Sequence, residues 1–332
     1  MIPFLELTPL GKSYDTEQGP SVIVKDFNLR VGEGEFVCII GHSGCGKSTV
    51  LSIAMGLNEA SEGGVIVAGK EVVGPGLDRG VVFQSPALLP WLTARENVLL
   101  AVEQVRERNG RKKTREIAEK YLSLVGLNDI AGCYPEELSA GMRQRVGIAR
   151  AFALEPKVLL LDEPFSLLDV ISRMELQDEL MRLWETARKT VLMVTHDVDE
   201  ALLLADRIVL MTNGPAATVG EILTVPFARP RARLSIVDDP LYHQTHAHLI
   251  HFLQERADRG RSTMFAVPVE KPNRAILEIG ADELLIVEKY TGFNRFRKKY
   301  RWLDEPLEST DGLTGWKRRR FSRLATKPRM TN

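Results

Sequence analysis

One octapeptide decides the fold class of this chain, Gly41-His42-Ser43-Gly44-Cys45-Gly46-Lys47-Ser48. It fits the pattern G-x-x-x-x-G-K-[ST] and lies between an apolar run, Phe36–Ile40, and a stretch with helical spacing, Lys47–Leu57. Small residues let such a loop wrap phosphate groups, and its N–H groups together with the helix N-terminus attract negative charge. The pattern predicts a nucleotide site in which Lys47 bridges the β- and γ-phosphates and the Ser48 hydroxyl ligates Mg²⁺.

Two carboxylates follow a second apolar run, Val158–Leu161, as Asp162 and Glu163. A strand that ends in this way places both groups at the carboxyl edge of a sheet, where ligands of α/β folds bind. Asp162 would hold Mg²⁺ through its water shell, and Glu163 would polarise the attacking water. Taken alone, Asp-Glu after a strand could instead cap a helix. Together with a phosphate loop, the pair is interpreted as metal-binding residue and base.

Short β-branched runs alternate with helical stretches from residue 1 to about 225, which predicts an α/β fold. Residues 86–154 are mostly helical in pattern and predict a helical subdomain inserted in that core. Thr93 and Glu96 form the spacing of a capping box at one helix start. We expect strands at Val22–Leu29, Phe36–Ile40, Gly80–Phe83, Val158–Leu161, Val191–Val194 and Arg207–Met211, and helices at Lys47–Leu57, Thr93–Val105, Lys112–Val125, Met142–Leu154 and Val170–Arg188.

The composition is that of a globular protein, with 44% apolar and 27% charged residues among 332. No apolar run reaches the ~18–20 residues that cross a bilayer, and the first residues show no secretory signal. Three cysteines are too few for a disulfide framework and fit a reducing compartment. We therefore expect a soluble, cytosolic chain.

The net charge of zero hides an asymmetry between the two ends of the chain. Residues 271–332 carry 15 Lys and Arg against 8 Asp and Glu, whereas the first 270 carry 29 against 36. We expect one domain over residues 1–228 and a C-terminal extension over 229–332. Arg229-Pro230-Arg231 is interpreted as a linker, Leu241–Arg256 has helical spacing, and the basic end is expected to be a mobile tail.

Four histidines lie close together in the extension, His243, His246, His248 and His251. Their helical spacing can chelate a metal ion. Because apolar residues are interspersed among them, we favour an amphipathic helix whose histidines form a solvated polar face. Cys45 is interpreted as a small filler of the phosphate loop, with a reactive thiol at the helix N-terminus as the alternative.

A third motif, Leu138-Ser139-Ala140-Gly141-Met142, resembles the signature L-S-G-G-Q of ABC transporter ATP-binding subunits. As in that family, it stands just before the strand that ends in Asp-Glu, and Ser166-Leu167-Leu168-Asp169 resembles the loop that communicates across the family's dimer. The resemblance covers about residues 4–225. It implies a P-loop NTPase core of ABC ATPase type with an inserted helical subdomain, followed here by a basic C-terminal extension.

The resemblance also assigns roles to single residues. Tyr14 matches the aromatic that stacks on adenine, Gln84 the glutamine that contacts Mg²⁺ and the membrane subunit, and His196 the histidine at the γ-phosphate. Taken alone, they could be a strand-edge aromatic, a turn residue and a helix cap. The implied ATP-binding residues are Tyr14, Gly41, His42, Ser43, Gly44, Cys45, Gly46, Lys47, Ser48, Thr49, Gln84, Ser139, Ala140 and Gly141; catalysis falls to Lys47, Glu163 and His196, and Mg²⁺ to Ser48, Gln84 and Asp162.

The signature departs from the family at Ala140 and Met142. A Cβ at residue 140 is tolerated there only if φ is negative, so we expect a weakened γ-phosphate contact. Met142 removes an amide group. These departures keep open a slow ATPase, pairing with a different partner subunit, or a weakly hydrolysing regulatory module.

One phosphate loop and one signature per chain imply two ATPase subunits, identical or paralogous, that sandwich two ATP molecules. The family further implies two membrane-spanning permease subunits, an extracytoplasmic anion-binding protein, and a peripheral position at the cytoplasmic face of the inner membrane. Nucleic-acid binding would rest on the basic tail alone, and a basic run without a recognisable fold is poor evidence for it, so we expect no nucleic-acid partner. Residues 84–93 are similar to importers of nitrate, sulfonates, taurine and cyanate, and residues 211–223 are most similar to nitrate/nitrite importers. The basic tail could be inert, contact anionic lipid or regulate the ATPase.

Overall fold

The computed structural model describes residues 3–17, 19–105, 111–264, 273–278, 283–289 and 297–302. The chain forms two compact units, Met1–Met264 and Phe265–Asn332. The sequence-based boundary at 228/229 stays a prediction. Within the described ranges, no helix combines the length and the apolar composition needed to span a bilayer.

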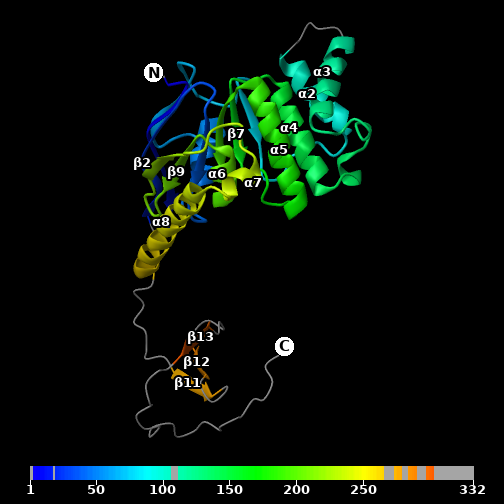
Figure 1. The fold of residues 1–332 in the computed structure, drawn as a ribbon. Coiled ribbons are helices and arrows are strands. Elements are labelled where there is room, and N and C mark those ends of the chain that lie inside the picture. Colours follow the sequence, from blue (N-terminus) through cyan, green and yellow to red (C-terminus); the bar gives the residue numbers. More distant parts are fainter. Residues whose placement is uncertain are drawn as a thin grey trace, which may run out of the picture. The chain divides into compact units, whose positions relative to one another are not determined.

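A six-stranded sheet forms the centre of the first unit, in the order β10-β9-β3-β8-β7-β6 (Figure 1). Its strands are β3 (Phe36–Ile40), β6 (Arg79–Val82), β7 (Val158–Asp162), β8 (Thr190–Val194), β9 (Arg207–Met211) and β10 (Val219–Thr224). All neighbours pair in parallel except β9 and β10. The strands expected for this sheet are confirmed, apart from β10, which was not predicted. Parallel pairing brings the carboxyl ends of β3, β7 and β8 to one edge.

A second, antiparallel sheet of four strands has the order β2-β1-β4-β5. It comprises β1 (Leu5–Thr16), β2 (Gly19–Val31), β4 (Glu62–Val67) and β5 (Lys70–Glu71). The sequence analysis found only part of β2. Strand β1 was missed because Pro9 and Gly11 interrupt its alternation, and the pairing of β1 with β2 and β4 shifts register around them.

The two faces of the parallel sheet are covered by different layers. In β3, Val37 and Ile39 pack in one core cluster with the antiparallel sheet and α1 (Lys47–Met55). The alternate residues Phe36, Cys38 and Ile40 pack in another cluster with the remaining helices. All five are fully buried, which explains the continuously apolar sequence of this strand.

The segment predicted as an inserted helical subdomain contains α2 (Ala94–Val105), α3 (Arg111–Leu124), the 3₁₀ turn η1 (Pro135–Glu137) and α4 (Ala140–Ala153). Helices α2, α3 and α4 pack against one another. The predicted capping box at α2 is confirmed, because Thr93 N donates to Glu96 Oε2 (2.8 Å) and Glu96 N donates to Thr93 Oγ1 (3.3 Å). Helices α5 (Val170–Ala187) and α6 (Val198–Leu204) follow β7 and β8.

The first unit ends in α7 (Arg233–Val237) and α8 (Pro240–Met264), and α8 lies against α6. The linker interpretation of Arg229-Pro230-Arg231 is wrong: Arg229 Nε lies 2.6 Å from Asp206 Oδ1, and Arg231 Nη1 donates to Ala205 O at 2.5 Å. These guanidinium groups tie the segment to the core, because carboxylate and carbonyl oxygens satisfy their N–H groups.

The second unit contains an antiparallel sheet of β11 (Asn273–Glu278), β12 (Glu283–Lys289) and β13 (Arg297–Trp302), with β12 in the middle. The basic end, predicted to be mobile, lies outside the described residues.

Candidate functional site

The phosphate loop joins β3 to α1, as the sequence predicted. Lys47 is buried, and its Nζ donates to the backbone oxygens of Gly41 and His42, both at 2.9 Å. Gly46 has φ +98°, and a Cβ there would lie 2.9 Å from Val24 Cγ2. A side chain at 46 would therefore be strained as well as crowded. The loop thus holds its lysine in a defined place within a tightly packed turn.

The first carboxylate lies directly beside this loop. Ser48 Oγ donates to Asp162 Oδ1 at 3.0 Å, which joins the start of α1 to the end of β7. Burial raises the pKa of Asp162, and the charge of Glu163 adds to this, while the hydrogen bond from Ser48 opposes it. A hydroxyl and a carboxylate in contact are oxygen ligands of the kind that Mg²⁺ prefers.

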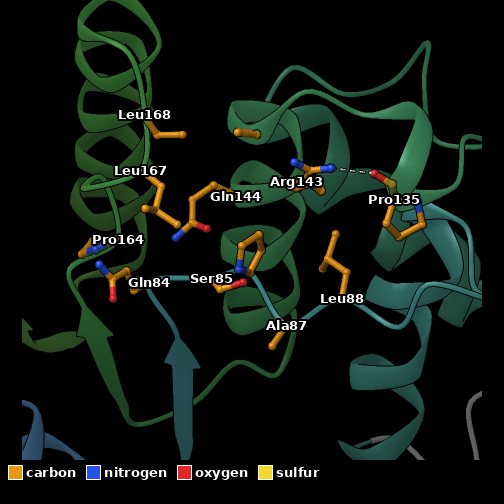
Figure 2. A pocket seen from close by; sticks show the side chains of 12 residues that line it. Gln84, Ser85, Ala87, Leu88, Pro135, Arg143, Gln144, Pro164, Leu167 and Leu168 are labelled. Carbon is orange, nitrogen blue, oxygen red and sulfur yellow. Dashed lines mark hydrogen bonds between the residues drawn. The ribbon is translucent and has the colours of Figure 1, made fainter. Parts of the chain in front are cut away.

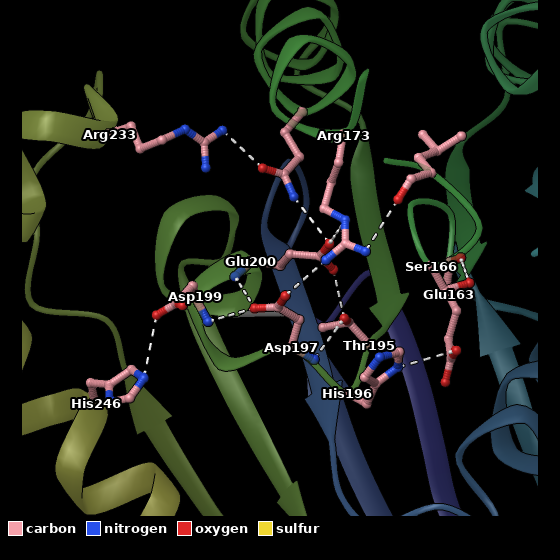
Figure 3. Close-up of polar contacts among 12 residues, drawn as sticks. Glu163, Ser166, Arg173, Thr195, His196, Asp197, Asp199, Glu200, Arg233 and His246 are labelled. Atoms are coloured by element: carbon pink, nitrogen blue, oxygen red, sulfur yellow. Dashed lines mark hydrogen bonds and ion pairs between the residues drawn. The ribbon is translucent and has the colours of Figure 1, made fainter. Parts of the chain in front are cut away.

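The second carboxylate is held by its backbone. Glu163 has φ +44°, a conformation that costs a non-glycine residue about 1–3 kcal/mol. Its N–H donates to Val194 O (2.9 Å), and its carbonyl accepts from Ser166 Oγ (3.0 Å). Its side chain lies against His196, with 3.3 Å between Glu163 Oε2 and His196 Nδ1 (Figure 3). The strained turn thereby fixes where the carboxylate sits relative to the imidazole.

Two plainer alternatives of the sequence analysis are wrong. His196 does not cap α6, because Asp197 does so by accepting from Asp199 N and Glu200 N. Asp162 and Glu163 do not cap α5, whose N-cap is Asp169.

Two predicted site residues lie at the margins. Tyr14 is on β1 and is 42% exposed as a residue, and Lys12 Nζ lies 4.8 Å from the ring centroid. Gln84 follows β6 and lines a groove of about 290 Å³ (Figure 2). Gln144 on α4 lines it too and donates to Phe83 O at 3.0 Å. The complete lining is Gln84, Ser85, Pro86, Ala87, Leu88, Pro135, Ala140, Arg143, Gln144, Pro164, Leu167 and Leu168.

The signature residues form the start of α4 and make different contacts. Ser139 is the N-cap and accepts from Met142 N at 3.2 Å. Ala140 is the first residue of the helix and has a negative φ there, so its Cβ strains no backbone. A Cβ at Gly141 would lie 3.5 Å from Ser172 at the start of α5. The hydrogen bond from Ser48 to Asp162 and the contact of Glu163 with His196 thus bring the phosphate loop, both carboxylates and the imidazole into one site, and the described contacts of the signature lie elsewhere, in α4 and α5.

Known proteins resemble both the sequence and the fold. The profile of the ABC transporter family matches residues 24–166. The nitrate import ATP-binding protein NrtD of Synechococcus elongatus is 51% identical over 253 residues, 76% of this chain and 92% of its own. The bicarbonate transport ATP-binding protein CmpD of Synechocystis is 52% identical over 253 residues, 76% and 90%. The chain belongs to the ABC transporter ATP-binding proteins.

The predicted fold and activity class follow with this membership. A dimeric post-hydrolysis structure of the ATP-binding cassette MJ0796 with ADP and Pi has a TM-score of 0.61 and 33% identity, and the match covers 68% of this chain and all of that one. The nitrate transport protein NasD of Klebsiella oxytoca is 47% identical over 257 residues, 77% of this chain and 98% of its own. The chain is an ATP-binding cassette that hydrolyses ATP, with the predicted P-loop NTPase core.

A buried polar network, which was not predicted from the sequence, lies behind His196 of this cassette. Thr195 Oγ1 donates to Glu200 Oε2 (2.6 Å), and Gln177 Nε2 donates to Glu200 Oε1 (3.0 Å). Arg173 lies 3.3 Å from Asp197 and Arg233 donates to Gln177, so three helices meet there. Burial raises the pKa of Glu200. The signal was available, because Glu200 directly precedes the apolar run Ala201–Leu204.

The contacts of Cys45 fit a small filler of the phosphate loop, and those of the α8 histidines fit a polar face of the helix. Cys45 is buried, and burial raises the pKa of its thiol, which disfavours the reactive thiolate. In α8, His246 lies 3.4 Å from Asp199, His248 lies 2.8 Å from Glu221, and His251 lies 3.7 Å from Glu255. Each of these histidines has a different acidic partner, and within the described residues no three His, Cys, Asp or Glu side chains gather around one metal position.

Proposed function

We propose that this cassette is the ATP-hydrolysing subunit of an ABC importer for a small inorganic anion, and that the anion is nitrate or nitrite. One observation carries the proposal: relatives at about half identity, matched over nine-tenths of their length or more, are named for nitrate import or transport. The similarity of residues 211–223 to nitrate/nitrite importers supports it. Bicarbonate is the second candidate, because CmpD is 52% identical.

In the proposed site, Lys47 and the loop amides hold the phosphates of ATP while Tyr14 stacks on adenine. Lys47 Nζ already faces two loop carbonyls, so the loop needs little ordering when it binds. Ser48 and Asp162 are the residues that would hold Mg²⁺, with Gln84 as the third predicted ligand. When bound, Mg²⁺ would offset the negative charge of the phosphate oxygens.

Glu163 is the proposed general base. It accepts a proton from the attacking water, and His196, 3.3 Å from its carboxylate, contacts the γ-phosphate and keeps the two groups together. The fixed backbone of Glu163 supports this role, because a base acts only from within hydrogen-bond reach of the proton that it removes.

The signature of a second subunit completes this site in our proposal. Ser139, Ala140 and Gly141 lie at a helix N-terminus, which attracts anionic phosphate. They make their contacts within α4 and α5, away from the phosphate loop. The dimeric state of the MJ0796 cassette supports the same arrangement. The second subunit is an identical chain or a paralogue.

The groove lined by Gln84 and Gln144 is the proposed docking site for the permease. The groove is lined by the segment after β6 and by α4, and Gln144 of α4 donates to Phe83 O in that segment. A permease segment bound there would therefore contact both Gln84 and the signature helix. Two permease subunits and an extracytoplasmic anion-binding protein would complete the importer. The cassette would then sit at the cytoplasmic face of the inner membrane as a peripheral subunit.

Uptake by cells that encode this chain tests the proposal. Labelled nitrate and labelled bicarbonate are supplied separately to cells with the native chain and with Lys47→Ala, at equal protein levels. Loss of nitrate uptake alone is the expected result. Loss of bicarbonate uptake alone would show that the importer carries bicarbonate and would refute nitrate as its substrate. If both persist, sulfonates, taurine and cyanate are the next substrates to measure.

A further inference from the structure

We infer that helix α8 fixes the phosphate loop through His42, so that the C-terminal part of the first unit sets the affinity of the cassette for ATP. His42 is then a positioning residue. The inference rests on the proposed role of Lys47 in holding the phosphates.

His42 makes contacts in two directions. Its backbone oxygen accepts one of the two hydrogen bonds from Lys47 Nζ, at 2.9 Å. Its ring Nε2 lies 2.5 Å from Leu253 O of α8. Because a carbonyl oxygen can only accept, Nε2 carries the proton and donates it. His42 therefore connects Lys47 of the phosphate loop to helix α8, which begins 193 positions after Lys47 in the chain.

Helix α8 is itself held firmly where it offers this carbonyl. Leu249 is fully buried in the core, and Tyr242 Oη donates to Asp199 Oδ1 at 2.5 Å. His248 Nε2 lies 2.8 Å from Glu221 Oε1 on β10. These contacts lie along one side of α8 and precede Leu253, so the position of its carbonyl is set by the cassette core.

Phe252 fixes the helix at the position next to Leu253. It packs over β10 where Gly220 has no side chain, and a Cβ at 220 would lie 2.6 Å from Phe252 Cζ. A real Cβ contact is never this short, so a methyl group at 220 displaces the ring. Gly220→Ala therefore forces the Phe252 ring away from β10 at the position next to Leu253, and the new Cβ would also lie 3.1 Å from Thr212 Cγ2 and 3.2 Å from Leu210 O. The substitution leaves the phosphate loop unaltered in sequence.

The first test compares donors at position 42 in the full-length chain. His42→Ala removes the hydrogen bond to Leu253 O, whereas His42→Gln keeps an N–H donor at the end of its side chain. Since a hydrogen bond contributes roughly 0.5–1.5 kcal/mol, we expect His42→Ala to raise the Kd for Mg-ATP about three- to tenfold. The Kd of His42→Gln for Mg-ATP should stay within about twofold of that of the native chain, because its side chain keeps the N–H donor.

His251→Ala is the matched control. His251 is an exposed histidine of the same helix, and its Nε2 lies 3.7 Å from Glu255 Oε1, also on α8. We expect its Kd for ATP to equal that of the native chain. Melting temperatures of all variants are recorded, because a general loss of stability would affect His42→Gln and His42→Ala alike.

The second test asks whether α8 acts through His42. Gly220→Ala should weaken ATP binding in the native background and should have no further effect in the His42→Ala background. Additive effects would overturn the inference, as would native affinity in His42→Ala or equal losses in His42→Ala and His42→Gln. Lys47→Ala separates the two proposals. If ATP binding survives this change, the proposed site itself is refuted. If Lys47→Ala abolishes ATP binding while His42→Ala binds ATP with native affinity, only the proposed role of α8 is refuted.

Discussion

The phosphate loop and the signature residues both lie at the start of a helix, and we propose that both contact phosphate, yet they differ in how many of their polar groups are bonded within the chain. At the loop, Lys47 is bonded to two carbonyls and Ser48 to Asp162. At the start of α4, Ser139 caps the helix by accepting from Met142 N, while Ser139 and Ala140 are exposed. One start is complete within the chain, and the other has room for an outside partner.

A third helix start sharpens this difference. Helix α2 begins with Thr93 and Glu96, which satisfy each other's backbone N–H groups in a capping box. Helix α4 has Ser139 at the matching position, but Met142 stands where α2 has Glu96 and has no group to return the hydrogen bond. The replacement of a glutamate by a methionine at this position leaves the signature helix half-capped.

The largest expected effect is at Glu163, in the complete half of the site. Glu163→Gln removes the proposed base and should lower the rate of ATP hydrolysis about 10²–10⁴-fold, the usual contribution of general base catalysis. ATP binding should persist, and Mg-ATP should then trap a dimer. Phosphate release and size-exclusion chromatography measure the two outcomes. A monomer with bound ATP would refute the view that the open start of α4 serves a second subunit.

A smaller effect is expected from Asp162, which the structure joins to Ser48. Asp162→Asn should raise the Mg²⁺ concentration that gives half-maximal ATPase activity about 10–100-fold. This is the usual effect of removing a group that holds a metal through its other ligands. Titration of activity with Mg²⁺ at fixed ATP gives the shift. Glu255→Gln, on the exposed side of α8, is the control for loss of a carboxylate, and its half-saturating Mg²⁺ should equal the native value. An unaltered Mg²⁺ titration in Asp162→Asn would contradict the metal assignment.

The signature helix should respond to a change in the opposite direction. Met142→Gln supplies the missing group at α4 and should raise kcat/KM for ATP about two- to tenfold, the effect of one net hydrogen bond. Ala140→Gly should change the rate less, because the φ of Ala140 is already negative. If Ala140→Gly has the larger effect, the Cβ and not the missing amide limits the contact.

The smallest effects concern the closed start of α2. Thr93→Ala should lower the free energy of unfolding by about 1 kcal/mol, measured by urea denaturation at pH 7. The hydrogen bonds from Thr93 lower the pKa of Glu96 in the folded chain. The contribution of ionised Glu96 to the free energy of unfolding is therefore fully present above the pKa that Glu96 has in the unfolded chain, and it is lost as the pH falls through the lowered, folded-state pKa. Glu96→Gln should therefore be less stable than the native chain at pH 7 and lose that difference in acid. A difference that is constant with pH would contradict this origin.

The phosphate loop and the two carboxylates could be predicted from sequence because each belongs to a local pattern, whereas Tyr14, Gln84 and His196 were assigned by the family resemblance alone. Gly41–Ser48, Asp162 and Glu163 all follow apolar strands of one parallel sheet, and such strands end at one edge. Strand β1 could not be found, because Pro9 and Gly11 hide its alternation and only tertiary pairing restores it. The contact of His42 with Leu253 joins segments far apart in sequence, and neither residue carries a pattern that announces the other.

Gly220 also decides which C-terminal segments this cassette can accept in a chimaera. Its missing side chain is the space that Phe252 occupies, so a graft of α8 onto another cassette requires a glycine at the facing position of β10. The converse graft, a helix with a small residue in place of Phe252, would leave a hollow over that strand. Recombination between cassettes of this kind must therefore exchange residues 220 and 252 as a pair.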